Sequence, residues 1–107
     1  MPKFLIEGSY SPEGIRGVIK EGFSSRKAAV EKLLAGLNGK LEAMYFALGS
    51  NDYFIIGEVP DLVSAAAVKL VVNATGMATT AKSTLLVSTE EVDAACKVTV
   101  AFRPPGA

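Results

Sequence analysis

The stretch GSNDYFIIGEVPDLVSAAAVKLVVNATG, residues 49–76, contains in order the signals for a turn, a strand and a helix. Residues 49–52 are turn-forming, and the apolar run at 53–59 that follows them predicts a strand. Pro60 ends that strand. Asp61 is a favourable N-cap and Gly76 is typical of the residue after a helix, so we expect a helix over residues 62–74.

The expected helix is apolar almost all round, with a thin polar stripe at Ser64, Lys69 and Asn73. A helix of this kind is covered by protein on more than one side. We expect the cover to be a neighbouring subunit, with Leu70 and Val71 at the interface. The alternative is that the chain's own C-terminal tail covers it.

The residues on either side of this stretch continue the pattern of strands and helices. Alternating runs at 3–10 and 41–48 predict two strands before it, and residues 78–87 predict a fourth strand after it. Between the first two strands, Ser11 and Pro12 mark the start of a helical segment that extends to residue 37. Glycines at 14, 17 and 22 predict a break within that segment.

The C-terminal segment has a helix signal of its own. Ser88 and Glu91 match a capping box, which predicts a short helix to about residue 97. Val98, Val100 and Phe102 then alternate with polar or small residues, as in an edge strand or an arm that lies over a neighbour.

The expected order of elements is strand, helix, strand, strand, helix, strand, followed by a helix and an extended tail. This order indicates an α+β fold, a ferredoxin-like βαββαβ sandwich in which a four-stranded antiparallel sheet carries its helices on one face. The 107 residues suit a single domain, with a core at 3–87 and a C-terminal helix and tail at 88–107. Because several strands are apolar on both faces, we expect the other sheet face to be covered as well.

Composition narrows the functional classes. Eleven basic and eleven acidic residues give no net charge and form no basic stripe, so we expect no nucleic-acid partner. There is no signal peptide or membrane-spanning run, and the single cysteine, Cys96, cannot form an internal disulfide; these features favour a cytoplasmic protein. The chain has no histidine, the commonest metal ligand and general base, so we expect neither a metal site nor a cofactor.

Several acidic residues and the cysteine are weak candidates for chemistry. Glu7 and Glu58 fall on strands expected to be neighbours, where two carboxylates could act as an acid/base pair; ion pairs at the sheet rim are the simpler interpretation. Asp52 lies in the turn and is expected to bond its local backbone, and Asp61 is explained by capping. Cys96 is expected to be a buried, unreactive thiol.

The tyrosines are the candidates for ligand binding. Tyr10, Tyr45 and Tyr53 could line a pocket between sheet and helices, with Arg16 placed to meet an anionic group. The alternative is that they are core residues whose hydroxyls reach the surface.

A set of short motifs, taken in order and spacing, is similar to the GYD domain family. The motifs are FLIEGSYS at 4–11, EGIRG at 13–17, SRKAA at 25–29, GSND at 49–52, IIGEVPD at 55–61 and the alanine-rich helix that ends at Gly76. One position departs from the family pattern, which places tyrosine just before the aspartate: this chain has Asn51 there, and Tyr53 follows the aspartate. The resemblance implies a ferredoxin-like fold of the dimeric α/β-barrel type and no established activity.

These features favour a homo-oligomeric module that binds a small organic molecule near the sheet. Two alternatives stay open. One is a cofactor-free isomerase or monooxygenase of the dimeric α/β-barrel kind, and the other is a purely structural assembly partner. Whether the chain is an enzyme is therefore left open at this point.

Overall fold

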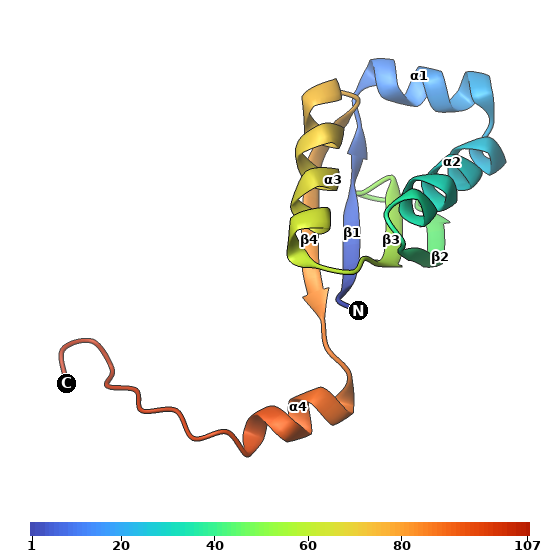
Figure 1. The fold of residues 1–107 in the computed structure, drawn as a ribbon. Coiled ribbons are helices and arrows are strands. Elements are labelled where there is room, and N and C mark those ends of the chain that lie inside the picture. The colour runs from blue at the N-terminus through green and yellow to red at the C-terminus, as the bar shows by residue number, and fades with distance from the viewer.

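The computed structural model describes residues 1–107 as one sheet with helices on one face and a C-terminal extension (Figure 1). The strands are β1 (Lys3–Tyr10), β2 (Lys40–Phe46), β3 (Tyr53–Glu58) and β4 (Ala78–Leu86), in the order β2-β3-β1-β4 with every pair antiparallel. The helices are α1 (Pro12–Glu21), α2 (Phe23–Gly36), α3 (Leu62–Thr75) and α4 (Thr89–Cys96). This confirms the α+β class and the ferredoxin-like order. None of the helices combines the length and the apolar character needed to cross a membrane.

Three helices start at the side-chain caps that the sequence predicts, whereas α2 starts at Phe23 without a side-chain cap. The side chains of Ser11, Asp61 and Ser88 each accept a hydrogen bond from the backbone N–H three residues further on, at 2.8–3.1 Å. At α4 the Glu91 carboxylate accepts in turn from the Ser88 N–H, which completes the capping box. The break between α1 and α2 falls at Gly22, whose φ of 98° is accessible to glycine and costly for other residues.

The register gives the sheet two different faces. Phe4 and Ile6 of β1 stand opposite Gly57 and Ile55 of β3, on the face that α2 and α3 cover. The alternate residues, Leu5 among them, point to the opposite face, which carries no helix (Figure 1). We call this second surface the open face of the sheet.

Each edge strand contains a bulge. In β2 the register shifts between Leu41 and Ala43, so Leu41 packs on the same side as Met44 instead of alternating with it as the sequence predicts. In β4 the shift lies opposite Gly8, where Thr80 has a φ of 50°. The bulges therefore decide which residues of the edge strands face the helices.

Few side chains are fully enclosed. The centre of the core is Met44, Tyr53 and Ile55, and no side chain in the chain is less than 2 % exposed. The Cα radius of gyration is 16.8 Å, against about 13 Å for a compact domain of this length. Much of the apolar surface consequently lies on the outside of the single chain.

The C-terminal segment lies away from the rest of the chain (Figure 1). Every residue from 87 to 107 is exposed. Val98, Val100 and Phe102 form no strand, so the edge-strand alternative is wrong. The tail does not cover α3 either, because α4 leads it outward from the end of β4 (Figure 1).

We expect Gly14→Ala to destabilise the fold. A methyl group at Gly14 would overlap the backbone carbonyl of Met77, which is itself held by a hydrogen bond from the Ser11 N–H at 2.8 Å. Displacement of this kind costs about 1–3 kcal/mol, and urea unfolding followed by circular dichroism measures it.

The matched control is Gly17→Ala on the same helix. Nothing lies within 4 Å of a methyl group at Gly17, so this change should raise the free energy of unfolding by up to about 1 kcal/mol. Equal effects of the two substitutions would contradict the contact between α1 and Met77.

Candidate functional site

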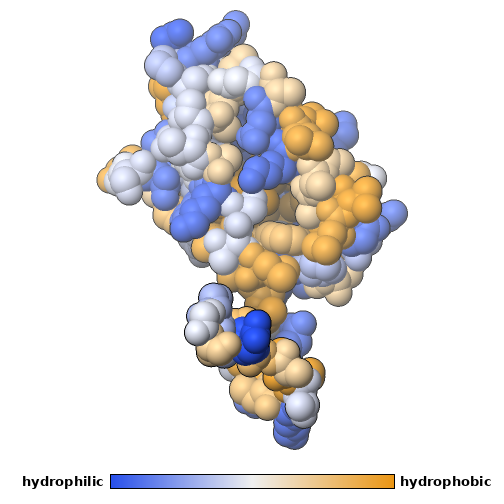
Figure 2. Space-filling view, turned by 90° about the vertical axis from the view of Figure 1, so that its left-hand side faces the viewer, coloured by the Kyte–Doolittle hydropathy of each residue, from blue (hydrophilic) through white to orange (hydrophobic).

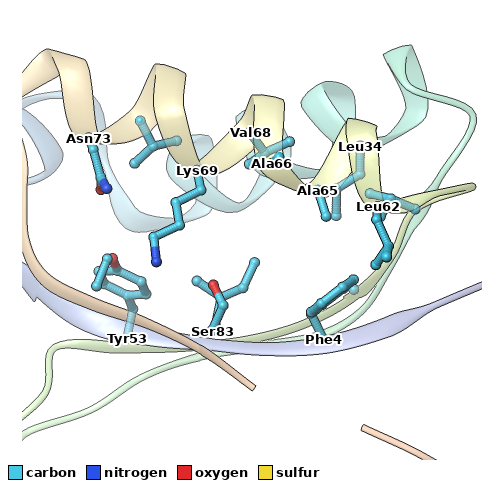
Figure 3. Close-up of a pocket in the computed structure, with 15 residues that line it drawn as sticks. Phe4, Leu34, Tyr53, Leu62, Ala65, Ala66, Val68, Lys69, Asn73 and Ser83 are labelled. Carbon is cyan, nitrogen blue, oxygen red and sulfur yellow. The ribbon is translucent and has the colours of Figure 1, made fainter. Parts of the chain in front are cut away.

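A cavity of about 300 Å³ lies between α3 and the helix-covered face of the sheet (Figure 3). Strands β1, β3 and β4 form its floor and α3 forms its roof. Most of its lining is apolar: Phe4, Ile6, Leu34, Gly57, Val59, Leu62, Ala65, Ala66, Val68, Val72 and Ala81. The side chains of Tyr53, Lys69, Asn73 and Ser83 add polar groups.

The cavity exists because small residues line both of its surfaces. Ala65 and Ala66 belong to the roof, and Gly57 and Ala81 belong to the floor. Protein interiors are normally filled to close packing, and these residues do not supply the volume to fill the space under α3. Leu34 fits closely against the glycine of the floor, since a Cβ on Gly57 would come within 3.0 Å of Leu34 Cδ1.

Helix α3 presents two polar side chains among mainly apolar ones to the cavity, and it leaves further large apolar side chains on the outside. Lys69 and Asn73 line the cavity, and Figure 3 shows the Lys69 side chain extending from α3 toward Tyr53 and the sheet. Leu70 and Val71, the predicted interface residues, are 70 % and 65 % exposed. An ordinary surface helix is polar on its outer face, whereas α3 is apolar on both sides.

Two of the predicted ligand-binding tyrosines lie together. Tyr53 lines the cavity, and its ring centroid is 5.0 Å from that of Tyr10. The Tyr53 hydroxyl fits against Gly8, where an added Cβ would be 2.7 Å from the oxygen. Glycine is therefore needed at this position of β1 to make room for the phenol.

Asp52 holds this end of the sheet together. Its N–H donates to the carbonyl of Gly8 at 2.8 Å, and its Oδ2 accepts from the N–H of Tyr10 at 2.9 Å. The expectation that Asp52 bonds only its local backbone is wrong, because the hairpin turn lies beside the end of β1. The carboxylate thus orders the strand that carries Tyr10.

Burial raises the pKa of both phenols, which are already protonated at neutral pH. Loss of solvent raises the pKa of Tyr10 to about 12, and the Arg26 guanidinium partly offsets this effect. Burial also raises the pKa of Tyr53, to which the nearby Asp52 carboxylate contributes. At neutral pH both hydroxyls are therefore available as hydrogen-bond donors.

Of the predicted ligand-binding residues only Tyr53 lines the cavity; Tyr10 packs against it from outside the lining. Tyr45 stands opposite Phe54 on the open face of the sheet and is 71 % exposed. Arg16 is exposed on α1 and does not line the cavity. The structure therefore brings Tyr10 and Tyr53 together and leaves Tyr45 and Arg16 apart from them.

Glu7 and Glu58 share the open face of the sheet but are not adjacent. Glu7 stands opposite Phe54 and Glu58 opposite Lys3, which separates the two carboxylates by about 13 Å along the strands. Glu58 is 19 % exposed and forms an ion pair with Lys40 at 3.5 Å. Neither carboxylate lines the cavity.

No three His, Cys, Asp or Glu residues lie together in a way that could hold a metal ion. Cys96 is exposed at the end of α4. The expectation of a buried thiol is wrong, because α4 extends away from the domain instead of packing on it.

A protein-family model, the GYD domain, matches residues 4–96. The chain belongs to the GYD domain family. Comparisons with curated proteins and with solved structures gave no match. The matched GYD region contains every residue that lines the cavity and ends at Cys96, the last residue of α4.

Of the four polar residues that line the cavity of this GYD domain, sequence reasoning identified Tyr53 and missed Lys69, Asn73 and Ser83. Lys69 and Asn73 were visible only as a polar stripe on an apolar helix, and nothing in the sequence showed that the stripe faces the sheet. Ser83 lies in β4 beyond the bulge, where simple alternation does not give its direction.

We expect Tyr10 to make the stability of the GYD domain fall at alkaline pH. The pKa of Tyr10 is about 12 in the folded chain, whereas an unfolded tyrosine loses its proton near about pH 10. Above that pH the unfolded state binds fewer protons than the folded state, so the free energy of unfolding decreases as the pH rises toward 12. Tyr10→Phe should show a shallower decrease when urea unfolding is compared between about pH 8 and about pH 11.

Tyr45→Phe on the open face is the matched control and should follow the parent chain, since its ring is exposed. Comparison between variants cancels the titration of the lysines, which all of them share. Identical slopes for Tyr10→Phe and the parent would contradict the burial of the Tyr10 hydroxyl.

Proposed function

We propose that this GYD domain is a homo-oligomeric module that binds a small organic molecule in the cavity under α3. The observation that carries the proposal is the cavity itself, about 300 Å³ in volume and apolar apart from a few polar groups. Binding sites for small molecules are typically concave and mainly apolar, with a few aimed polar groups, and this volume lies at the lower end of their range. The ligand is therefore compact and has a largely apolar body.

Assembly is supported by apolar surfaces that the single chain leaves uncovered. Large exposed side chains lie on the outer face of α3 and in the C-terminal segment: Val63, Leu70, Val71, Val98, Val100 and Phe102. Figure 2 shows apolar side chains at the surface of the molecule and around the junction with the C-terminal segment. Groups of exposed large apolar side chains are typical of surfaces that another protein chain covers. A second copy of the chain is the simplest cover, because every copy carries the same surfaces.

The enzymatic alternative, a cofactor-free isomerase or monooxygenase, has one observation in its favour. Tyr53 is buried and faces the cavity, so its hydroxyl could donate a proton or a hydrogen bond to a substrate oxygen. The candidate bases, Glu7 and Glu58, lie on the open face of the sheet. We therefore favour ligand binding over catalysis. A purely structural role would not account for the cavity.

Filling the cavity should weaken ligand binding. The test titrates the uncharged fluorescent probe 2-naphthalenemethanol into the purified protein. Ala65→Phe places a ring in the roof of the cavity and should lower the affinity at least about tenfold, because the probe loses its buried apolar contacts.

Ala28→Phe is the matched control, since Ala28 is exposed on α2 and does not line the cavity. This variant should bind the probe as the parent does, and urea unfolding shows whether both variants are folded. A parent chain that binds no probe, or equal affinity of the parent and a folded Ala65→Phe, would contradict the proposed site.

Leu70→Glu and Val71→Glu should each dissociate the oligomer. A carboxylate placed in an apolar interface without a partner is costly to bury. Native mass spectrometry and size-exclusion chromatography with light scattering give the mass of each variant, and Lys32→Glu, exposed on α2, is the control that should stay assembled. A monomeric parent, or fully retained assembly in both variants, would count against this interface.

A further inference from the structure

We infer that the ligand of the cavity is an organic monoanion, a carboxylate with an apolar body, whose charge is met by the ammonium group of Lys69. The inference deepens the proposed function and rests on it. It follows from the charge of the cavity lining, from the arrangement of its polar groups and from the character of those groups as donors.

Lys69 is the one charged side chain that lines the cavity. No aspartate or glutamate belongs to the lining, and the ion pairs of the chain involve Lys3, Arg26 and Lys40 instead. Lys69 forms no ion pair and no hydrogen bond within the chain. Lys69 is exposed, so water solvates its ammonium in the free chain. Because no carboxylate belongs to the lining, the ammonium is free to pair with an anion that enters the cavity from outside.

The polar groups of the cavity are gathered in one part of it. Figure 3 shows Lys69, Asn73, Tyr53 and Ser83 in the same region, whereas Phe4 and Leu62 lie at the opposite end with Leu34 and Ala65. A ligand that fits this arrangement has one polar end and one apolar end. It enters with its polar head under Lys69 and its apolar body toward Phe4.

The groups around Lys69 favour an acceptor over a donor. The ammonium offers only donors, and the Tyr53 and Ser83 hydroxyls and the Asn73 amide each have an N–H or O–H to give. A tyrosine hydroxyl is protonated at neutral pH, and burial, which raises the pKa of Tyr53, acts in the same direction. A carboxylate accepts through both oxygens and carries the single negative charge that one ammonium balances, while a phosphate dianion would leave a charge unpaired.

The test uses three probes that share a naphthalene ring and differ in charge: 2-naphthoate, 2-naphthalenemethanol and 2-naphthylmethylamine. The parent chain should bind the carboxylate about tenfold more tightly than the alcohol, the effect of one charged hydrogen bond, and the ammonium probe more weakly than either. Lys69→Met keeps the length of the side chain and removes its charge. It should bind the carboxylate no better than the alcohol while its affinity for the alcohol is unchanged or higher.

Lys32→Met, exposed on α2 and outside the lining, is the matched control and should keep the preference for the carboxylate. Lys69→Arg should restore much of that preference, since it returns the positive charge. If the parent binds the alcohol as tightly as the carboxylate, or if Lys69→Met keeps the preference, the inference is wrong while the proposed function stands. If none of the three probes binds, the proposed function itself fails.

Discussion

The position of α3 depends on hydrogen bonds at its two ends more than on packing along its length. Before the helix, Val59 is buried and its N–H donates to the carbonyl of Pro2 at 3.2 Å; after it, the carbonyl of Met77 accepts from Ser11 at 2.8 Å. Pro2 and Ser11 flank β1, so both ends of α3 are fixed to the two ends of one central strand. Between these points no residue of α3 is buried. The cavity is therefore the space between α3, which is held at its two ends, and the small side chains of the sheet below it.

This arrangement places α3 between two different environments. Successive residues of a helix point in directions about 100° apart, so Lys69 can face the cavity while Leu70 and Val71 face outward. The proposed ligand and the proposed second copy would contact the same helix from opposite sides. A ligand that fills the cavity supports α3 from below, and a more rigid α3 is a better surface for a partner because less side-chain entropy is lost on assembly. On this proposal, ligand binding and assembly would be linked through α3.

The sequence alone was sufficient to predict a helix start wherever the interaction that fixes it is local. Caps at Ser11, Asp61 and Ser88 lie within a few residues of the groups they bond, and they mark the helices correctly. The cavity could not be predicted in the same way. Its alanines are visible in the sequence, but only the fold shows that they line one cavity with Gly57. The long-range bond of Asp52 to β1 likewise depends on where the hairpin lies.

The bulge in β4 illustrates how tertiary pairing decides the chemistry of the cavity. Thr80 adopts a φ of 50°, a conformation that costs a β-branched residue about 1–3 kcal/mol. The extra residue reverses the alternation of the strand, so that Ser83 faces α3 and Lys82 faces the open side. With strict alternation from Thr79, the ammonium of Lys82 would lie beneath α3 together with Lys69. Two cations in one apolar cavity would repel each other and would suit a dianion, so the strained backbone at Thr80 is what keeps the charge of this cavity at one.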